Sequence, residues 1–197
     1  MARSADLTAE KLLQAAHELL VERPGNEPSV SEICARAGVN VAMVSYCFGG
    51  KTQLLDALLA RTVADVVVQL DRLTALDLGP AETLRRHVAG VITNYVRYPY
   101  AVALGERLGD PDGRMAESFA RPLLDFHRRL LAAGEESGDF RPGVDPTFFF
   151  STLVGACEFL FSARTWVEGA TGQPIDAGLV ARFTEHTAGL LLDGLRR

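Results

Sequence analysis

Residues 29–51 read SVSEICARAGVNVAMVSYCFGGK, and this stretch predicts two short helices joined by a tight turn. Ser29 and Glu32 have the spacing of a capping box, in which each side chain accepts a hydrogen bond from the other residue's backbone N–H. Gly38 is expected to end the first helix, because glycine adopts a left-handed backbone conformation at little cost. Asn40 can cap the second helix, whose inward stripe is then Val44 and Phe48.

Three positions in this stretch have the spacing of a helix-turn-helix. Cys34 is small enough for two helices to cross closely, Gly38 forms the turn, and Val44 locks the second helix against the first. In such a motif the second helix enters the major groove of DNA. The spacing alone also suits an ordinary helical hairpin with solvated polar residues, so it leaves both readings open.

Three segments, LTAEKLLQAAHELL (7–20), SVSEICARAGVN (29–40) and SYCFGGKTQLLDALL (45–59), resemble in order the three-helix DNA-binding domain of the TetR family of bacterial transcriptional regulators. The resemblance is strongest at Ala37-Gly38-Val39, at Tyr46, at Phe48-Gly49 and at Lys51 with Leu54-Leu55. It implies a helix-turn-helix domain over residues 1–51 and a larger helical domain for effector binding and dimerisation over residues 52–197. It implies nothing about the identity of the effector.

The remaining sequence predicts helices and no strands, so the expected fold class is all-α. Thr8 is expected to cap the first helix, and a long helix over 52–78 should link the two domains. Further helices are expected over 81–98, 100–108, 115–133, 147–169 and 177–195, with loops over 23–28 and 134–143. Pro122 predicts a kink or a one-turn offset near the start of its helix.

Composition narrows the class of protein. Hydrophobic residues make up 48% of the 197 residues, which is enough for a packed core. No apolar run reaches the roughly 18 residues of a membrane span, and the N-terminus is polar, so a cytoplasmic location is expected. Three cysteines without a CxxC pair, and four scattered histidines, predict no disulfide framework, metal site, cofactor or catalytic set.

The charge balance limits how the chain can bind DNA. The net charge is -5, which argues against a protein that coats nucleic acid indiscriminately. The first 60 residues contain five basic and seven acidic side chains. Specific binding must therefore depend on a few well-placed groups and on two copies that read two half-sites.

The candidate DNA contacts are the outward residues of the second hairpin helix and two helix starts. Asn40 and Ser45 can hydrogen-bond bases or phosphates, and Ala42 and Met43 can touch a thymine methyl group. The family resemblance implies phosphate contacts at Tyr46 and Lys51, but Val41 and Cys47 lack the basic side chains that the family often has there. The full set is Ser29, Asn40, Val41, Ala42, Met43, Ser45, Tyr46 and Lys51.

The candidate effector pocket consists of aromatic and polar residues in the second domain, since ligand pockets are mostly apolar with a few convergent polar groups. We expect it to include His87, Asn94, Tyr98, Phe119, Phe126, His127, Cys157 and Phe161. Each of these residues can equally belong to an ordinary core.

Small residues along 151–162 and an apolar face over 179–191 predict a four-helix interface between two copies of the chain. The expected interface residues are Phe149, Thr152, Ala156, Leu160, Phe183, Thr187, Leu190 and Leu191. Burial of the same residues against the chain's own core is the alternative.

Together these features predict a ligand-responsive transcriptional regulator. We expect a repressor that binds a palindromic double-stranded DNA operator as a homodimer and is released by a small apolar or amphipathic effector. The alternatives are an enzyme, for which no catalytic motif is present, and a helical adaptor that binds other proteins.

Overall fold

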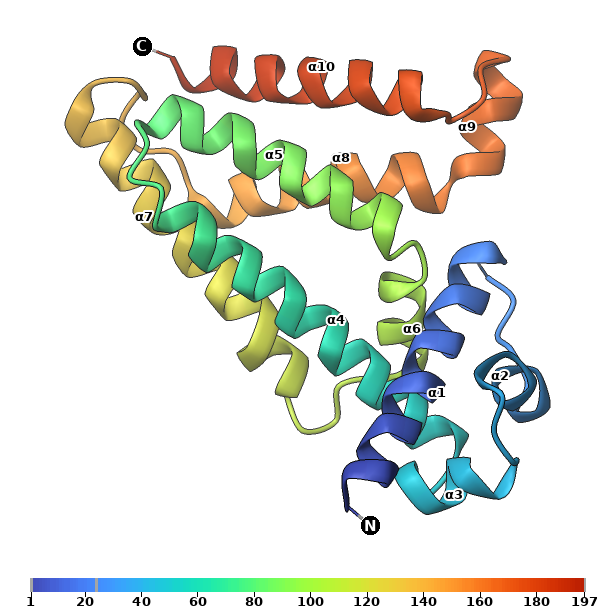
Figure 1. Cartoon of the computed structure of the whole chain (residues 1–197). Coiled ribbons are helices and arrows are strands. Elements are labelled where there is room, and N and C mark those ends of the chain that lie inside the picture. Colours follow the sequence, from blue (N-terminus) through green and yellow to red (C-terminus); the bar gives the residue numbers. More distant parts are fainter. Residues whose placement is uncertain (1, 24, 197) are drawn as a thin grey trace. The chain divides into compact units, whose positions relative to one another are not determined.

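The computed structural model describes residues 2–23 and 25–196, and all regular secondary structure in these residues is helical (Figure 1). This confirms the all-α prediction. By their contacts the residues form two compact units, Met1–Ala64 with Tyr98–Arg114, and Asp65–Arg97 with Met115–Arg197. We refer to these as unit 1 and unit 2. The functional division at residue 51 stays a prediction.

Unit 1 contains α1 (Ala2–Glu22), α2 (Val30–Ala37), α3 (Ala42–Phe48), the first part of α4 (Lys51–Thr74) and α6 (Ala101–Leu108). Both α2 and α3 pack on α1. The unit has a continuous apolar core, because each helix contributes residues at helical spacing. Its fully buried members include Leu12, Ala16, Ile33, Leu54, Leu55 and Leu58.

Tyr100, at the start of α6, binds the core of unit 1 through its hydroxyl group. The Tyr100 Oη lies 2.9 Å from His17 Nδ1 and 3.3 Å from Thr62 Oγ1. Tyr98 packs edge-on against the same histidine ring, with 5.8 Å between the ring centroids. These contacts attach α6 to the N-terminal helices, although it follows them by many residues in sequence.

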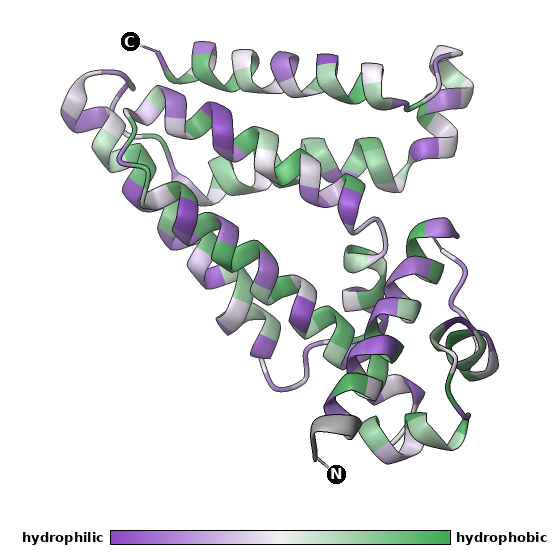
Figure 2. Ribbon diagram, viewed as in Figure 1, coloured by the Kyte–Doolittle hydropathy of each residue, from purple (hydrophilic) through white to green (hydrophobic). Residues whose placement is uncertain are grey.

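Unit 2 contains the rest of α4, then α5 (Pro80–Arg97), a π-helical turn (Ala116–Ala120), α7 (Arg121–Ser137), α8 (Pro146–Ser162), α9 (Arg164–Thr171) and α10 (Ala177–Leu195). Helix α5 packs against α7, α8 and α10. Its stripe of Leu84, Val88 and Ile92 is buried in the core, together with Phe140, Leu153 and Leu192. Figure 2 shows apolar residues along most of α8, whereas α5 and α7 carry both apolar and polar residues.

Several predicted helix boundaries are wrong. Helix α1 begins at Ala2, so Thr8 lies inside it and is not its N-cap. Helix α4 ends at Thr74 rather than at 78, and Asp77 beyond it has a positive φ of 48°. Near Pro122 the expected offset takes the form of the π-helical turn directly before α7.

The predicted loop at Gly134 is also wrong, because α7 continues to Ser137. Gly134 is buried, and a Cβ atom there would lie 1.9 Å from Cδ2 of the Phe140 ring. The glycine is thus required by close packing inside a helix and does not mark its end.

The single helix predicted over 147–169 is instead broken at Ala163, and α8 and α9 meet at 76°. Contacts distant in sequence hold α9 in this direction: Arg164 Nη2 donates to the Ile175 carbonyl at 2.9 Å, and Glu168 accepts from the Ile175 N–H at 2.8 Å. In the described part of the chain no single helix is long and apolar enough to cross a membrane. Only α8 and α9 taken together across their bend reach that length and composition.

Candidate nucleic-acid interface and effector site

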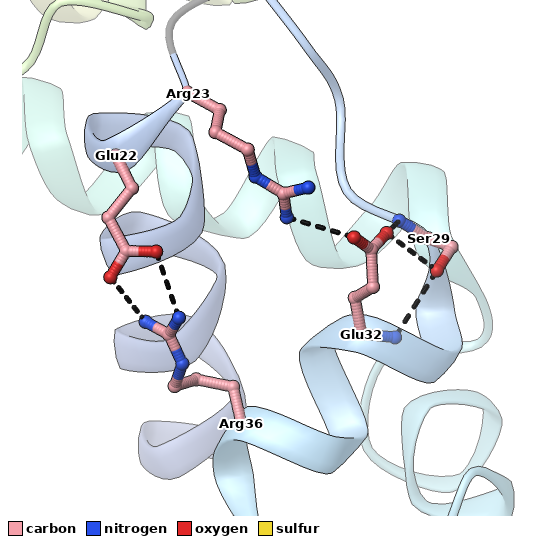
Figure 3. Close-up of polar contacts among 5 residues, drawn as sticks. All are labelled: Glu22, Arg23, Ser29, Glu32 and Arg36. Atoms are coloured by element: carbon pink, nitrogen blue, oxygen red, sulfur yellow. Dashed lines mark hydrogen bonds and ion pairs between the residues drawn. The ribbon is translucent and has the colours of Figure 1, made fainter.

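The capping box at the start of α2 is present, as predicted (Figure 3). Ser29 N–H donates to Glu32 Oε2 at 2.8 Å, and Glu32 N–H donates to Ser29 Oγ at 3.2 Å. Hydrogen bonds from the Ser29 backbone, the Ser29 hydroxyl and Arg23 lower the pKa of Glu32 to about 2. Gly38 ends α2 with φ 67° in the left-handed region, which confirms the turn.

Helix α3 starts at Ala42, and its N-cap residue is Val41 rather than the predicted Asn40. Asn40, one residue earlier, still accepts a hydrogen bond from Ala42 N–H through its Oδ1 at 2.9 Å. The side-chain oxygen of Asn40 is therefore engaged, and only its NH₂ group can donate to a base or a phosphate. Val44 is buried and anchors α3 to the rest of unit 1. The motif is thus assembled by local caps and one apolar anchor.

The outer face of α3 is open to solvent. Tyr46 is 73% exposed, Val41, Ala42 and Ser45 are exposed, and Met43 is half-buried. These side chains contribute methyl groups, hydroxyl groups and one aromatic ring, but no charge. A surface of this kind can contact base edges and thymine methyl groups, but it gains little from the charge of the DNA backbone.

The cation nearest in sequence to α3, Lys51, forms an ion pair. Its Nζ lies 2.6 Å from Glu27 Oε1, and the other oxygen of Glu27 lies 2.7 Å from Nε of Arg107 on α6. One carboxylate thus bridges two cations, and we call Glu27, Lys51 and Arg107 the Glu27 bridge. Sequence reasoning missed Glu27 and Arg107, because no local pattern relates a loop glutamate to an arginine on a distant helix.

Other basic side chains of unit 1 are paired in the same way. Arg36 makes a bidentate contact with Glu22 at 2.8 and 2.9 Å, and Arg23 pairs with Glu32 at 2.9 Å (Figure 3). The Arg36 hydrogen bonds lower the pKa of Glu22. Both partners of each pair belong to unit 1, so its acidic residues neutralise these arginines. In a protein that binds DNA without sequence preference, such cations would be free to contact phosphates.

In unit 2 the predicted pocket residues His87 and His127 form a buried pair. Their Nε2 atoms lie 2.8 Å apart, and the His127 ring packs edge-on against Phe149 with centroids 5.0 Å apart. Phe126 lies 4.7 Å from the His87 ring. Burial lowers the pKa of both histidines, so both are neutral at pH 7.

Two buried polar atoms of unit 2 have no hydrogen-bond partner among the described residues: Nδ1 of His127 and Oδ1 of Asn94. Buried polar atoms are nearly always satisfied in native proteins. Such atoms are normally satisfied by an ordered water molecule or by a ligand.

A second aromatic contact adds Tyr95, which the predicted pocket did not include. Its ring stacks on Phe161 with 5.6 Å between centroids and 6° between planes. Burial, and then the negative charges of Glu158 and Cys157, raise the pKa of Tyr95. Cys157 is fully buried, and burial raises the pKa of its thiol to about 12.

The structure separates one of the eight predicted pocket residues, Tyr98, from this cluster. Tyr98 belongs to unit 1, where it packs on His17, so its assignment to the pocket needs correction. Phe119 lies half-buried on the π-helical turn. Tyr98 follows α5 directly in sequence, and no local pattern reveals that the chain changes unit there.

The predicted dimer residues divide into two groups. Phe149, Leu160 and Thr187 are buried in the core of their own unit, as the alternative interpretation stated. Thr152, Ala156 and Leu190 are exposed, and Phe183 and Leu191 are half-buried. The large exposed apolar side chains on these helices are Phe148, Phe159, Trp166 and Leu190, with Trp166 at 77% and Leu190 at 64%.

An open groove of about 590 Å³ lies between α8 and α9. It is lined by Gly155, Glu158, Phe159, Ser162, Ala163, Thr165 and Trp166. Gly155 and Ala163 have little or no side chain and so leave room for the groove. The rings of Phe159 and Trp166 contribute apolar surface.

The capped hairpin with its exposed helix α3, combined with a separate helical unit, defines a helix-turn-helix protein with an additional domain. Residues 12–58 match the family model of "Bacterial regulatory proteins, tetR family", and residues 77–196 match "Tetracyclin repressor-like, C-terminal domain". The chain belongs to the TetR family and is a ligand-responsive transcriptional regulator.

Individual relatives agree with this assignment. The chain is 26% identical to the HTH-type transcriptional repressor NicS of Pseudomonas putida, over all of this chain and 96% of that protein. A TetR/AcrR-family regulator from Thermobifida fusca has a similar fold, with a TM-score of 0.73 at 24% identity over 96% of this chain and 98% of that one. FadR of Bacillus subtilis, solved with stearoyl-CoA, gives a TM-score of 0.67 at 19% identity over 95% and 99%.

Proposed function

We propose that this regulator is a repressor that binds a palindromic operator as a dimer and is released by a small apolar or amphipathic effector. The observation that carries the proposal is the exposed, uncharged outer face of α3, held by the capping box at Ser29 and the Gly38 turn. In a helix-turn-helix this face meets base edges in the major groove. Family members bind DNA operators and small-molecule effectors and act as dimers.

At the DNA, the roles follow from the chemistry of each side chain. The Asn40 NH₂ and the Ser45 hydroxyl are the candidates for polar contacts, and Val41, Ala42 and Met43 for thymine methyl groups. Tyr46 and Lys51 are the candidates for phosphate contacts, although Lys51 must share its charge with Glu27. Ser29 already uses its hydroxyl and its N–H on Glu32, so a phosphate there would compete with the capping box.

The DNA-binding claim is tested by titrating the full-length protein against its own upstream intergenic DNA at about 100 mM salt. We expect a specific complex that Tyr46→Phe and Lys51→Gln each weaken, with Lys51→Gln reducing the salt dependence by about one charge per protomer. Arg86→Gln, which removes an exposed cation from unit 2, is the matched control. A wild-type protein that binds no native promoter fragment specifically would refute the proposal.

The dimer is proposed to form through the exposed apolar side chains of α8 and α10, namely Phe148, Phe159 and Leu190 with Thr152 and Ala156. Trp166 is the single tryptophan of the chain and lies beside Phe159 in the groove, so its fluorescence reports whether a second copy covers this face. Phe159→Glu should give a monomer with red-shifted emission, whereas Val68→Glu, at another exposed apolar position, should not. A monomeric wild type in light scattering at micromolar concentration would refute the dimer.

Helix α4 is the proposed link between effector and DNA, because it begins at Lys51, next to α3, and continues into unit 2. An effector can shift the regulator away from DNA only by binding the non-DNA-binding form more tightly. The adaptor alternative rests on the groove between α8 and α9. It would be favoured only if Phe159→Glu left the oligomeric state unchanged and operator binding were absent.

A further inference from the structure

The unsatisfied atoms of the histidine pair carry information about the effector. His127 is fully buried, and its Nδ1 has no hydrogen-bond partner among the described residues, while its Nε2 is bonded to His87. Leaving a buried polar atom unpaired is unfavourable, so such an atom is normally satisfied by a water or a ligand. A molecule with a hydrogen-bonding group is therefore expected at this nitrogen.

One face of helix α5 carries His87 together with an open backbone position. His87, Gly90 and Asn94 recur at intervals of three and four residues, so they lie along one face of the helix. Gly90 is half-buried, and no heavy atom lies within 4 Å of the position that a Cβ atom would take there. His87 and Asn94 are separated by about 10 Å along the helix axis. Gly90 thus offers room on the helix face that also carries His87 and Asn94.

The tautomers of the pair define which ligand groups suit it. If His127 donates its Nε2 proton to His87, its Nδ1 is an acceptor; if His87 donates, His127 Nδ1 carries the proton and is a donor. A hydroxyl group both donates and accepts, so it satisfies His127 Nδ1 in either state. Asn94 Oδ1 is an acceptor, so it also requires a donor such as a hydroxyl or an N–H group.

Charge excludes an acidic ligand. The buried residues described in the structure include no lysine or arginine, and both buried imidazoles are uncharged at pH 7. A buried carboxylate or phosphate would therefore lack a counter-charge and would be strongly disfavoured.

We propose that unit 2 binds, beside the His87–His127 pair, a neutral aromatic compound with a hydroxyl group, which bonds to His127 Nδ1 while its ring packs among Phe126 and Phe149. This compound class acts as the effector, so the inference rests on the proposed function of unit 2. Rings suit the site because the histidine pair is already lined by aromatic side chains at 4.7 and 5.0 Å.

The test compares three probes of similar size, para-butylphenol, para-butylbenzoate and butylbenzene, by calorimetric titration of the full-length protein at pH 7. We expect para-butylphenol to bind at least tenfold more tightly than either of the others. Gly90→Leu, which fills the open space, and Asn94→Leu should each weaken para-butylphenol at least threefold. Thr93→Leu, on the exposed side of the same helix, should not change it.

His127→Phe keeps the ring but removes the nitrogen, and it should lose the preference for the phenol over butylbenzene. Because this variant also leaves His87 without its partner, circular dichroism and specific operator binding serve as its folding controls, and Gly90→Leu gives an independent test. Equal or tighter binding of para-butylbenzoate, no binding of para-butylphenol, or affinities unchanged in both Gly90→Leu and Asn94→Leu would each overturn the inference.

Operator binding, measured in parallel by fluorescence anisotropy, separates this inference from the proposed function. Specific operator binding without any phenol binding overturns only the ligand class. Absence of operator binding under all conditions overturns the regulator mechanism, whatever the probes do. If para-butylphenol binds and leaves operator affinity unchanged, its assignment as an effector is overturned.

Discussion

The substitution Glu27→Gln tests how this acidic domain controls its affinity for DNA. Glu27 bridges Lys51 at 2.6 Å and Arg107 at 2.7 Å, so these three side chains together carry one positive charge. Glutamine has nearly the same shape but no charge, which leaves two unneutralised cations in each protomer. If Lys51 contacts a phosphate, the variant makes that contact without first giving up its ion pair.

The expected magnitude follows from the exposure of the pair. The side chains of Lys51 and Glu27 are 32% and 31% exposed, so solvent screens part of their attraction. Opening such a pair costs about 0.5–1 kcal/mol. A dimer opens two pairs, and removing that penalty should tighten operator binding by about 5- to 30-fold. The slope of log affinity against log salt should steepen by up to about 2, because up to one further phosphate is neutralised in each half-site.

The assay is fluorescence anisotropy with the native operator fragment between about 50 and 200 mM salt. Glu82→Gln is the matched control: it removes one carboxylate from an exposed ion pair with Arg86 in unit 2 and so makes the same change in net charge. Thermal melts of both variants establish that they are folded. If Glu27→Gln and Glu82→Gln bind the operator with equal affinity and equal salt slope, then Glu27 does not restrain Lys51, and Lys51 is not a phosphate contact.

Three further predictions concern stability and side-chain chemistry. Gly134→Ala should destabilise the protein by about 1–3 kcal/mol, because its Cβ would lie 1.9 Å from the buried Phe140 ring. Gly189→Ala, where no atom lies within 4 Å, should melt at or above the wild-type temperature, and equal melting of both variants would contradict the packing argument. An NMR titration of the Glu32 carboxyl should give a pKa near 2, and Ser29→Ala should raise it. Since the folded pKa of Glu32 lies below the usual 4.5, its stabilisation of the fold is present above pH 4.5 and is lost as the pH falls toward 2. If the difference in unfolding free energy between the wild type and Glu32→Gln stayed constant over this pH range, the argument would be contradicted. A thiol reagent applied to the native protein should modify half-buried Cys47 before the fully buried Cys34 and Cys157, and peptide mass spectrometry showing Cys157 modified at a comparable rate would argue against a closed core.

The features that could be read from the sequence are those produced by interactions between near neighbours. The Ser29–Glu32 capping box and the left-handed Gly38 depend on backbone groups within a few residues, and both are confirmed. Asn40 also bonds to the first turn of α3, but the N-cap position lies one residue later, at Val41. The Asp145 cap followed by Pro146 at the start of α8 is another local signal that the structure contains. Helix class and the family resemblance follow from the same local patterns, because the apolar period along a helix does not depend on its tertiary partners.

The tertiary structure decided what depends on packing between distant segments. The sequence predicts a helix end at Gly134, whereas in the structure the Phe140 ring occupies the space where a Cβ atom would lie. The sequence also predicts Tyr98 as a pocket residue, whereas its contact with His17 places it in unit 1. The Glu27 bridge and the His87–His127 pair likewise join side chains from different helices. A one-dimensional pattern defines which face of a helix is apolar, but not which residue of another helix meets it. For this protein, the sequence by itself therefore determined the helix-turn-helix motif, and only the packed helices determined which charges pair around it and which buried polar atoms have no partner among the described residues.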